Sequence, residues 1–156
     1  ELNYNFNFYP VKEIEYIFVA AQPYLDNLHM REDLSALTAK EKELNLFKSA
    51  NLMLLDEENI TRQYVDTYFN DNNIEFTHLL EVSNMDLIIE FARIGLGMAC
   101  VIKEFVHDDL ANGKISEIPL LTPIPKKSVG FAYSQKIPLS SSAEKFVQFY
   151  ETFSQV

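Results

Sequence analysis

Thr61 and Arg62 follow a short apolar run, residues 51–55 (NLMLL), at the point where a helical repeat of apolar residues begins. The backbone N–H groups in the first turn of a helix have no partner within the helix and form the positive end of its dipole. A hydroxyl and a guanidinium beside those N–H groups would suit a small anion, because a guanidinium can bind a carboxylate through two parallel hydrogen bonds. The pattern therefore indicates a site for a small anionic molecule.

A second polar pair, Ser83 and Asn84, follows another apolar stretch, residues 76–82 (FTHLLEV), again where a helix is expected to begin. In an open α/β sheet, ligands bind beyond the carboxyl ends of the strands, so the two polar pairs are candidates for one site. The alternative interpretation is that Asn59 and Ser83 are only helix caps, Ser83 with Asp86 as its reciprocal partner in a capping box.

No residue pattern points to catalysis or to metal binding. The three histidines, His29, His78 and His107, lack the spacing of metal ligands. The single cysteine, Cys100, lies in an apolar run, where an inert buried thiol is expected. The sequence contains no P-loop, nucleophile elbow or zinc-protease motif. We therefore predict no catalytic residue, no metal site, no cofactor, and a protein that is not an enzyme.

The segment 76–106 must position these residues, and it carries the clearest local pattern. A strand over 76–82 is followed by a helix with apolar residues at helical spacing over 85–92, by Gly95 as a left-handed C-cap, and by an apolar strand over 98–102. Strand, helix and strand within about 30 residues form a βαβ unit, whose two strands we expect to be parallel.

The rest of the chain continues the alternation of strands and helices. Further strands are expected over 13–21, 51–55, 115–120 and 128–134, and further helices over 38–47, 60–69, 103–110 and 141–153. Two of these helices begin with a capping-box pattern, at Thr38 with Glu41 and at Ser141 with Glu144. The alternation predicts an α/β fold: a Rossmann-like, open, largely parallel (mixed) sheet flanked by helices.

Composition narrows the range of functions. A chain of 156 residues with 47% apolar residues can build one domain around a buried core. The net charge of −10 argues against direct binding to nucleic acid or to an anionic membrane. No apolar run is long enough to span a membrane, and the first residues lack a signal-peptide pattern, so we expect a cytoplasmic protein.

Several segments together resemble the C-terminal effector-binding (substrate-binding) domain of LysR-type transcriptional regulators. Residues 81–120 show the family's order of a polar pair, a helix ending in a GLG turn at 95–97, an apolar strand, a short helix closed by Asn-Gly, and a strand ending near a proline. Residues 51–69 resemble its ligand-facing strand–turn–helix, and residues 13–24 resemble the strand that crosses into the second subdomain. Gln22 stands where the family often has histidine, and Ile102 where proline is usual.

The resemblance implies a fold of the type II periplasmic-binding-protein kind, with two subdomains and the ligand in the cleft between them. Residues 1–156 would be a partial effector-binding domain. About 13–125 would form the complete second subdomain, and about 126–156 the strand and helix that return to the first. Since the sequence does not begin with Met, we expect an N-terminally truncated chain whose winged helix-turn-helix lies outside it.

The resemblance also implies the function: a ligand-sensing regulatory domain of a bacterial regulator that binds a small anionic effector and self-associates as a homodimer or tetramer. DNA would be bound only through the winged helix-turn-helix absent from this chain. The expected effector-binding residues are Thr61, Arg62, Ser83 and Asn84, joined by Gln22 and its neighbour Ala21 near a crossover. The alternatives are a stand-alone or extracytoplasmic solute-binding protein of the same architecture, a small α/β enzyme using Cys100, and a protein-interaction domain.

Overall fold

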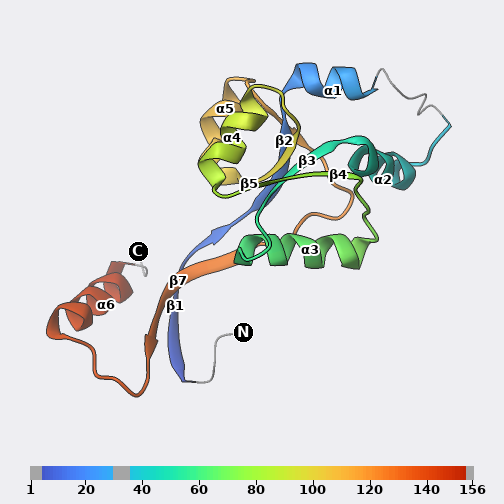
Figure 1. The fold of residues 1–156 in the computed structure, drawn as a ribbon. Coiled ribbons are helices and arrows are strands. Elements are labelled where there is room, and N and C mark those ends of the chain that lie inside the picture. Colours follow the sequence, from blue (N-terminus) through green and yellow to red (C-terminus); the bar gives the residue numbers. More distant parts are fainter. Residues whose placement is uncertain (1–4, 30–35, 154–156) are drawn as a thin grey trace. The chain divides into compact units, whose positions relative to one another are not determined.

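The computed structural model describes residues 5–29 and 36–153 (Figure 1). Its strands are β1 (Phe6–Ile14), β2 (Tyr16–Ala20), β3 (Asn51–Leu55), β4 (His78–Val82), β5 (Met98–Ile102), β6 (Ser116–Ile118) and β7 (Lys127–Ser134). Its helices are α1 (Gln22–His29), α2 (Ala39–Ser49), α3 (Ile60–Asn72), α4 (Met85–Arg93), η1 (Lys103–Val106, a 3₁₀ turn), α5 (His107–Ala111) and α6 (Ser141–Phe153). The chain divides into a larger unit, Glu15–Pro125, and a smaller unit formed by Glu1–Ile14 and Lys126–Val156.

The larger unit contains a five-stranded mixed sheet with the order β4-β3-β5-β2-β6. Strand β3 runs parallel to both β4 and β5, whereas β2 runs antiparallel to both β5 and β6. The predicted mixed α/β architecture is therefore confirmed. The two strands of the predicted βαβ unit, β4 and β5, are parallel as expected but are not neighbours, because β3 lies between them.

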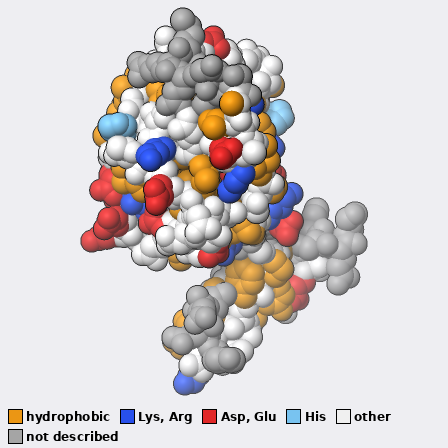
Figure 2. All heavy atoms as spheres, turned by 90° about the vertical axis from the view of Figure 1, so that its right-hand side faces the viewer, with side chains coloured by type: hydrophobic (Ala, Val, Ile, Leu, Met, Phe, Trp, Pro, Cys, Tyr) orange, Lys and Arg blue, Asp and Glu red, His pale blue; other side chains and the backbone are white. Residues whose placement is uncertain are grey.

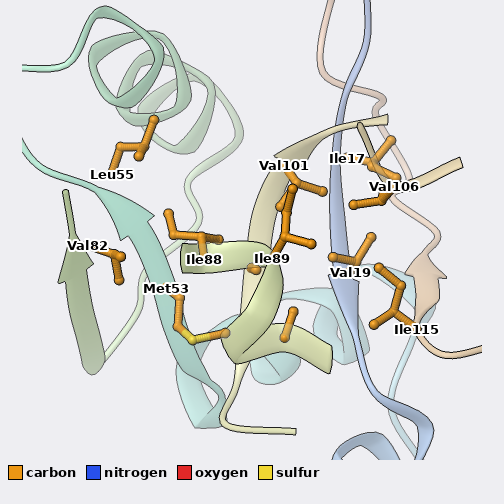
Figure 3. Close-up of a cluster of buried hydrophobic side chains, with 12 residues drawn as sticks. Ile17, Val19, Met53, Leu55, Val82, Ile88, Ile89, Val101, Val106 and Ile115 are labelled. Atoms are coloured by element: carbon orange, nitrogen blue, oxygen red, sulfur yellow. The ribbon is translucent and has the colours of Figure 1, made fainter. Parts of the chain in front are cut away.

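Side chains of the central strands alternate between two layers of helices. On one face, the Phe18 ring contacts Phe47 of α2 and Phe69 of α3, with centroid distances of 4.9 and 5.7 Å. On the other face, Ile17 and Val19 belong to a buried cluster that includes side chains of α4 (Figure 3). Strands covered on both faces read as continuous apolar runs, which is why β2, β3 and β5 have no polar–apolar alternation.

The predicted start of α2 and end of α4 are confirmed. Thr38 is the N-cap of α2, and its capping box with Glu41 is complete in both directions. Gly95 has a φ of +77°. The N–H groups of Gly95 and Leu96 donate to carbonyls in the last turn of α4, which is a Schellman motif. This turn ends α4 and leads the chain into β5.

Two other predicted caps lie one residue away from the observed ones. Asn84, not Ser83, is the N-cap of α4, and its Oδ1 accepts a hydrogen bond from the N–H three residues ahead. At α6 the Ser140 hydroxyl accepts from the N–H three residues ahead, so Ser141 is the first helical residue rather than the cap. Adjacent cap-forming residues satisfy the same sequence pattern, and backbone geometry decides between them.

The predicted strand over 13–21 is wrong in its boundaries. Glu15 separates β1 from β2, and the first of these strands belongs to the smaller unit. Helix α1 directly follows β2 and was not predicted, and Pro23 lies in its first turn. A proline is compatible with that place because the N–H it lacks would have no intrahelical partner there.

The smaller unit is an antiparallel ribbon of β1 and β7 that packs against α6. Phe131 of β7 contacts Phe146 and Tyr150 of α6, with centroid distances of 4.9 and 5.6 Å. Phe6 and Phe149 remain 45% and 60% exposed. Figure 2 shows hydrophobic side chains gathered on the surface of this unit.

The surface charges form no continuous basic patch on the face shown in Figure 2, where Lys and Arg side chains are scattered among Asp and Glu. Within residues 5–29 and 36–153, no helix has the length and apolar character needed to cross a membrane.

Candidate effector site

The carboxyl ends of β3, β4 and β5 meet at one end of the sheet, together with the beginning of β2. Leu55 pairs with Val82 at the ends of two parallel strands. Tyr16, the first residue of β2, pairs with Ile102, the last residue of β5. Helices α3 and α4 begin beyond this end of the sheet, so their first turns bring together the two polar pairs singled out in the sequence.

At the start of α3, Asn59 is the N-cap, and its Oδ1 accepts a hydrogen bond from the Thr61 N–H at 2.9 Å. The cap predicted for Asn59 is thus confirmed. The half-buried Thr61 side chain places its Oγ1 3.2 Å from the hydroxyl of Tyr16. Sequence reasoning did not select Tyr16, and no local signal could have selected it, because the two residues are 45 positions apart.

Arg62 is fixed inside the protein. Its side chain is 5% exposed. The Nε group donates to both carboxylate oxygens of Asp66 at 2.9 and 3.0 Å, and Nη1 donates to Glu81 at 2.7 Å and to the Leu55 carbonyl at 3.0 Å. Burial acts to lower the pKa of the Arg62 guanidinium, but the hydrogen bonds and charges of Asp66 and Glu81 outweigh burial and raise it. Arg62 therefore ties α3 to β3 and β4.

Ser83 and Asn84 occupy the turn between β4 and α4, and both are exposed. The Asn84 Oδ1 is used as the helix cap. The exposed side chains of this turn and the first turn of α3 lie beyond neighbouring parallel strands, which is the geometry that an anion-binding site of this kind requires.

Gln22 and Ala21 lie at the opposite end of the sheet from Thr61. Strand β2 runs antiparallel to β5, so the residues after β2 lie near the beginning of β5 rather than its end. There, the Gln22 side chain donates to Asp26 at 2.8 Å and accepts from the Ser116 hydroxyl at 3.2 Å. Ala21 is 4% exposed.

Other reactive groups offer little chemistry. Across the described part of the chain, no cluster of three or more His, Cys, Asp or Glu could hold a metal ion. The side chain of His29 lies outside the described residues. Cys100 is 3% exposed, and burial raises the pKa of its thiol far above the ordinary value, so the thiol stays protonated. A protonated, inaccessible thiol is not a nucleophile.

Comparison with known proteins identifies the family. The model of the LysR substrate binding domain matches residues 15–154. The uncharacterized HTH-type transcriptional regulator YeiE of Escherichia coli (strain K12) is 22% identical over 133 residues, which are 84% of this chain and 45% of that protein. The chain thus spans about half the length of the curated relatives it matches.

Solved structures show the same fold. The CcmR regulatory domain of Synechocystis PCC6803, solved in complex with 2-PG, has a TM-score of 0.74 at 12% identity, over 98% of this chain and 69% of that one. The effector-binding domain of QuiR in complex with shikimate has a TM-score of 0.67 at 14% identity, over 99% and 68%. The predicted periplasmic-binding-protein-like fold is therefore confirmed.

The family match covers most of the chain, and the solved neighbours are regulatory domains. The chain is accordingly a ligand-binding regulatory domain and not an enzyme. It belongs to the LysR substrate-binding domain family, the effector-binding module of LysR-type transcriptional regulators.

Proposed function

We propose that this domain senses a small anionic effector at the end of the sheet where α3 and α4 begin. The wall facing the effector is formed by Thr61, Ser83 and Asn84. One observation carries the proposal: two helix N-termini with hydroxyl and amide side chains stand side by side in the fold, beyond the parallel strands β3 and β4. Unpaired N–H groups and the positive dipole ends there favour a negative charge.

Arg62 keeps a place in the proposal as a positioning residue. Its charge is already met by Asp66 and Glu81, so it holds the first turn of α3 in place and does not itself supply the cation for the effector. The preference for an anion rests on the helix N-termini. It is supported by a relative of the same fold, QuiR, whose ligand shikimate is a carboxylate. Gln22 lies at the opposite end of the sheet and is left out of the wall.

Titration calorimetry on the whole regulator with a panel of small carboxylates, shikimate included, tests this site. Thr61→Val removes the hydroxyl but keeps the shape of the side chain, and we expect it to weaken binding by about tenfold, the effect of losing a hydrogen bond to a charged group. Thr67→Val on the same helix is the matched control, because the Thr67 hydroxyl is exposed and donates to the Gln63 carbonyl within α3. Equal affinities of wild type and Thr61→Val would reject the assignment.

The proposal extends to the assembly that the domain serves. We assign Glu15–Pro125 to the family's second subdomain, and the β7–α6 segment to the part returning to the first. Effector binding would bias how the subdomains are arranged and thereby how an oligomer presents its winged helix-turn-helix domains to DNA. The proposed compartment is the cytoplasm, where DNA and metabolites are both accessible.

Self-association, the second part of the proposal, is supported by the outer strand of the sheet. β4 is an edge strand whose Leu80 side chain is 42% exposed, and such edges pair readily with another chain. Light scattering on the whole regulator is expected to show a dimer or larger oligomer that Leu80→Lys weakens. Ile137→Lys, at a 70% exposed position outside the sheet, is the control. A wild-type monomer at high concentration would contradict this part of the proposal.

A further inference from the structure

Helix α3 holds the chain where it leaves the larger unit. The Tyr64 hydroxyl donates to the Pro125 carbonyl at 2.6 Å, and the Tyr68 hydroxyl donates to the Thr122 carbonyl at 2.7 Å. The two tyrosines are one helical turn apart and therefore present their hydroxyls along one face of α3. Between the two carbonyls, Ile124 is 3% exposed. This exit segment, Thr122–Pro125, is thus fixed along α3 from both ends.

The tyrosine hydroxyls of α3 are reliable donors at neutral pH. Burial is the main reason that the pKa of Tyr68 rises to about 12, and burial likewise raises the pKa of Tyr64. Each hydroxyl therefore keeps its proton, and a carbonyl oxygen, which can only accept, is a matched partner.

The same helix also contacts the chain where it enters the larger unit. The hydroxyl of Tyr16 lies 3.2 Å from the Thr61 Oγ1. The Tyr16 ring lies against the Tyr64 ring, with a centroid distance of 5.8 Å and an interplanar angle of 55°. Because Tyr16 is only 7% exposed, its ring has little room to move without displacing a neighbour. One continuous row of contacts thus joins Thr61, Tyr16, Tyr64 and Pro125.

We propose that this row transmits a change at Thr61 to the exit segment Thr122–Pro125, with Tyr16 and Tyr64 as positioning residues. We take the Thr61 hydroxyl as the donor to the Tyr16 hydroxyl oxygen, so an anionic ligand group that accepts the single Thr61 proton competes with Tyr16 for it. The Tyr16 ring then shifts against Tyr64, whose bond to the Pro125 carbonyl is short and directional. The inference rests on the proposed function only in taking Thr61 as an effector contact, since the row itself lies wholly within the larger unit.

Hydrogen–deuterium exchange on the whole regulator, without any ligand, tests the row. The readout is the exchange rate of peptides covering residues 121–126 in wild type, Thr61→Val, Tyr64→Phe and the double variant. Thr61→Val stands in for the competing ligand, because it removes the hydroxyl that Tyr16 contacts. Tyr150→Phe is the matched control: it removes a tyrosine-to-carbonyl hydrogen bond of the same kind, to Val11, in the smaller unit.

We expect Thr61→Val and Tyr64→Phe each to raise the exchange rate of 121–126 by roughly fivefold, the size of one lost hydrogen bond. The double variant should exchange no faster than Tyr64→Phe alone, because both changes break the same row. Tyr150→Phe should leave these peptides unchanged. If circular dichroism shows that Tyr64→Phe does not fold, Tyr16→Phe replaces it, since it removes only the hydroxyl next to Thr61.

An unchanged rate in Thr61→Val, or rate increases that multiply in the double variant, would overturn the inference, because independent structural contributions add in free energy. The result is separate from the test of the proposed function. A regulator that binds none of the carboxylates can still show the coupled exchange. A regulator whose affinity depends on Thr61 can equally lack the coupling.

Discussion

The two units of this chain differ in how they bury their apolar residues. Every buried hydrophobic residue within the described ranges 5–29 and 36–153 lies in the larger unit. The smaller unit leaves large apolar side chains exposed on both its ribbon and its helix, among them Phe6 at 45% and Phe149 at 60%. The larger unit therefore has a core of its own, while the ribbon of β1 and β7 with α6 does not.

The size of each sheet explains this difference in burial. A two-stranded ribbon is marginal in water unless further strands or helices cover its apolar face. A five-stranded sheet with helices on both faces is not subject to this limit, because helices cover the side chains on both faces of each central strand. Stability is therefore expected to be concentrated in the larger unit, and substitutions of the same type should have unequal effects in the two units.

Truncation of a core aromatic should show the largest contrast. Phe18→Ala removes a ring that is 0% exposed and lies against Phe47 and Phe69, and we expect a loss of about 3–5 kcal/mol in the free energy of unfolding. Phe131→Ala, at a site 38% exposed, should lower it by about 1 kcal/mol or less. Urea denaturation followed by circular dichroism measures both.

The reverse ranking, or equal losses, would break the comparison between the units. Phe18→Leu serves as the control. Leucine keeps most of the buried apolar area at that position, so this variant should lose less stability than Phe18→Ala.

A pair of glycines should show the next largest contrast. A Cβ at Gly97 would overlap the carbonyl oxygen of Asn51, and a Cβ at Gly130 would overlap that of Tyr9. Gly97 leads into a strand that is buried between helices, so Gly97→Ala should cost about 2 kcal/mol or more. Gly130→Ala should cost less although the overlap is similar, because the exposed ribbon can shift. Thermal unfolding measures the loss of stability in both variants. Equal losses of stability would show that the ribbon is as rigid as the sheet.

Local sequence patterns predicted much of this fold. They failed for features that depend on contacts between residues far apart in the sequence. The Gly95 turn and the Thr38 capping box depend on neighbours within a few residues, and both are confirmed. The position of β3 between β4 and β5 is set by packing across the sheet, and the periodicity of apolar residues within one segment does not indicate it. Helix α1 is missing from the predicted helices, because a proline just after a strand is compatible both with the end of the strand and with the first turn of a helix.

The residues of the candidate site likewise fall into those that local sequence order predicts and those that depend on the arrangement of the sheet. Helix starts placed Thr61, Ser83 and Asn84 at one end of the sheet because strand–turn–helix order fixes that geometry. Gln22 is at the other end because β2 is antiparallel, which the sequence does not indicate. The i, i+4 spacing of Arg62 and Asp66 in the sequence is typical of an ion pair on a helix, and it could have indicated that the guanidinium is already paired.

Helix caps should give a smaller contrast between the units. Asn84→Ala removes the cap of α4 and should lower the free energy of unfolding by about 1 kcal/mol. Ser140→Ala removes the cap of α6, but α6 belongs to the smaller unit, so the main unfolding transition should shift by less. Ser83→Ala is the control for the corrected cap, with a change within about 0.5 kcal/mol. If Ser83→Ala proved as harmful as Asn84→Ala, the assignment of the cap would be wrong.

The smallest expected effect is a pH dependence from the capping box of α2. The Thr38 side-chain hydroxyl and backbone N–H donate to the Glu41 carboxylate and lower its pKa below the ordinary value of 4.5. A pKa that is lower in the folded state stabilises the fold above the unfolded-state value and loses that contribution as the pH falls through the folded-state value. Glu41→Gln should therefore lower the melting temperature slightly at pH 7, and the difference from wild type should shrink below about pH 4.5. Glu144→Gln on α6 is the control for replacing a carboxylate in the first turn of a helix, because Ser141 is not the cap of α6 and does not form the predicted capping box with Glu144. It should leave the main transition unchanged at both pH values. A pH-dependent shift of equal size from Glu144→Gln would mean that any carboxylate in a first helical turn gives the effect, and the capping box of α2 would then not be its source.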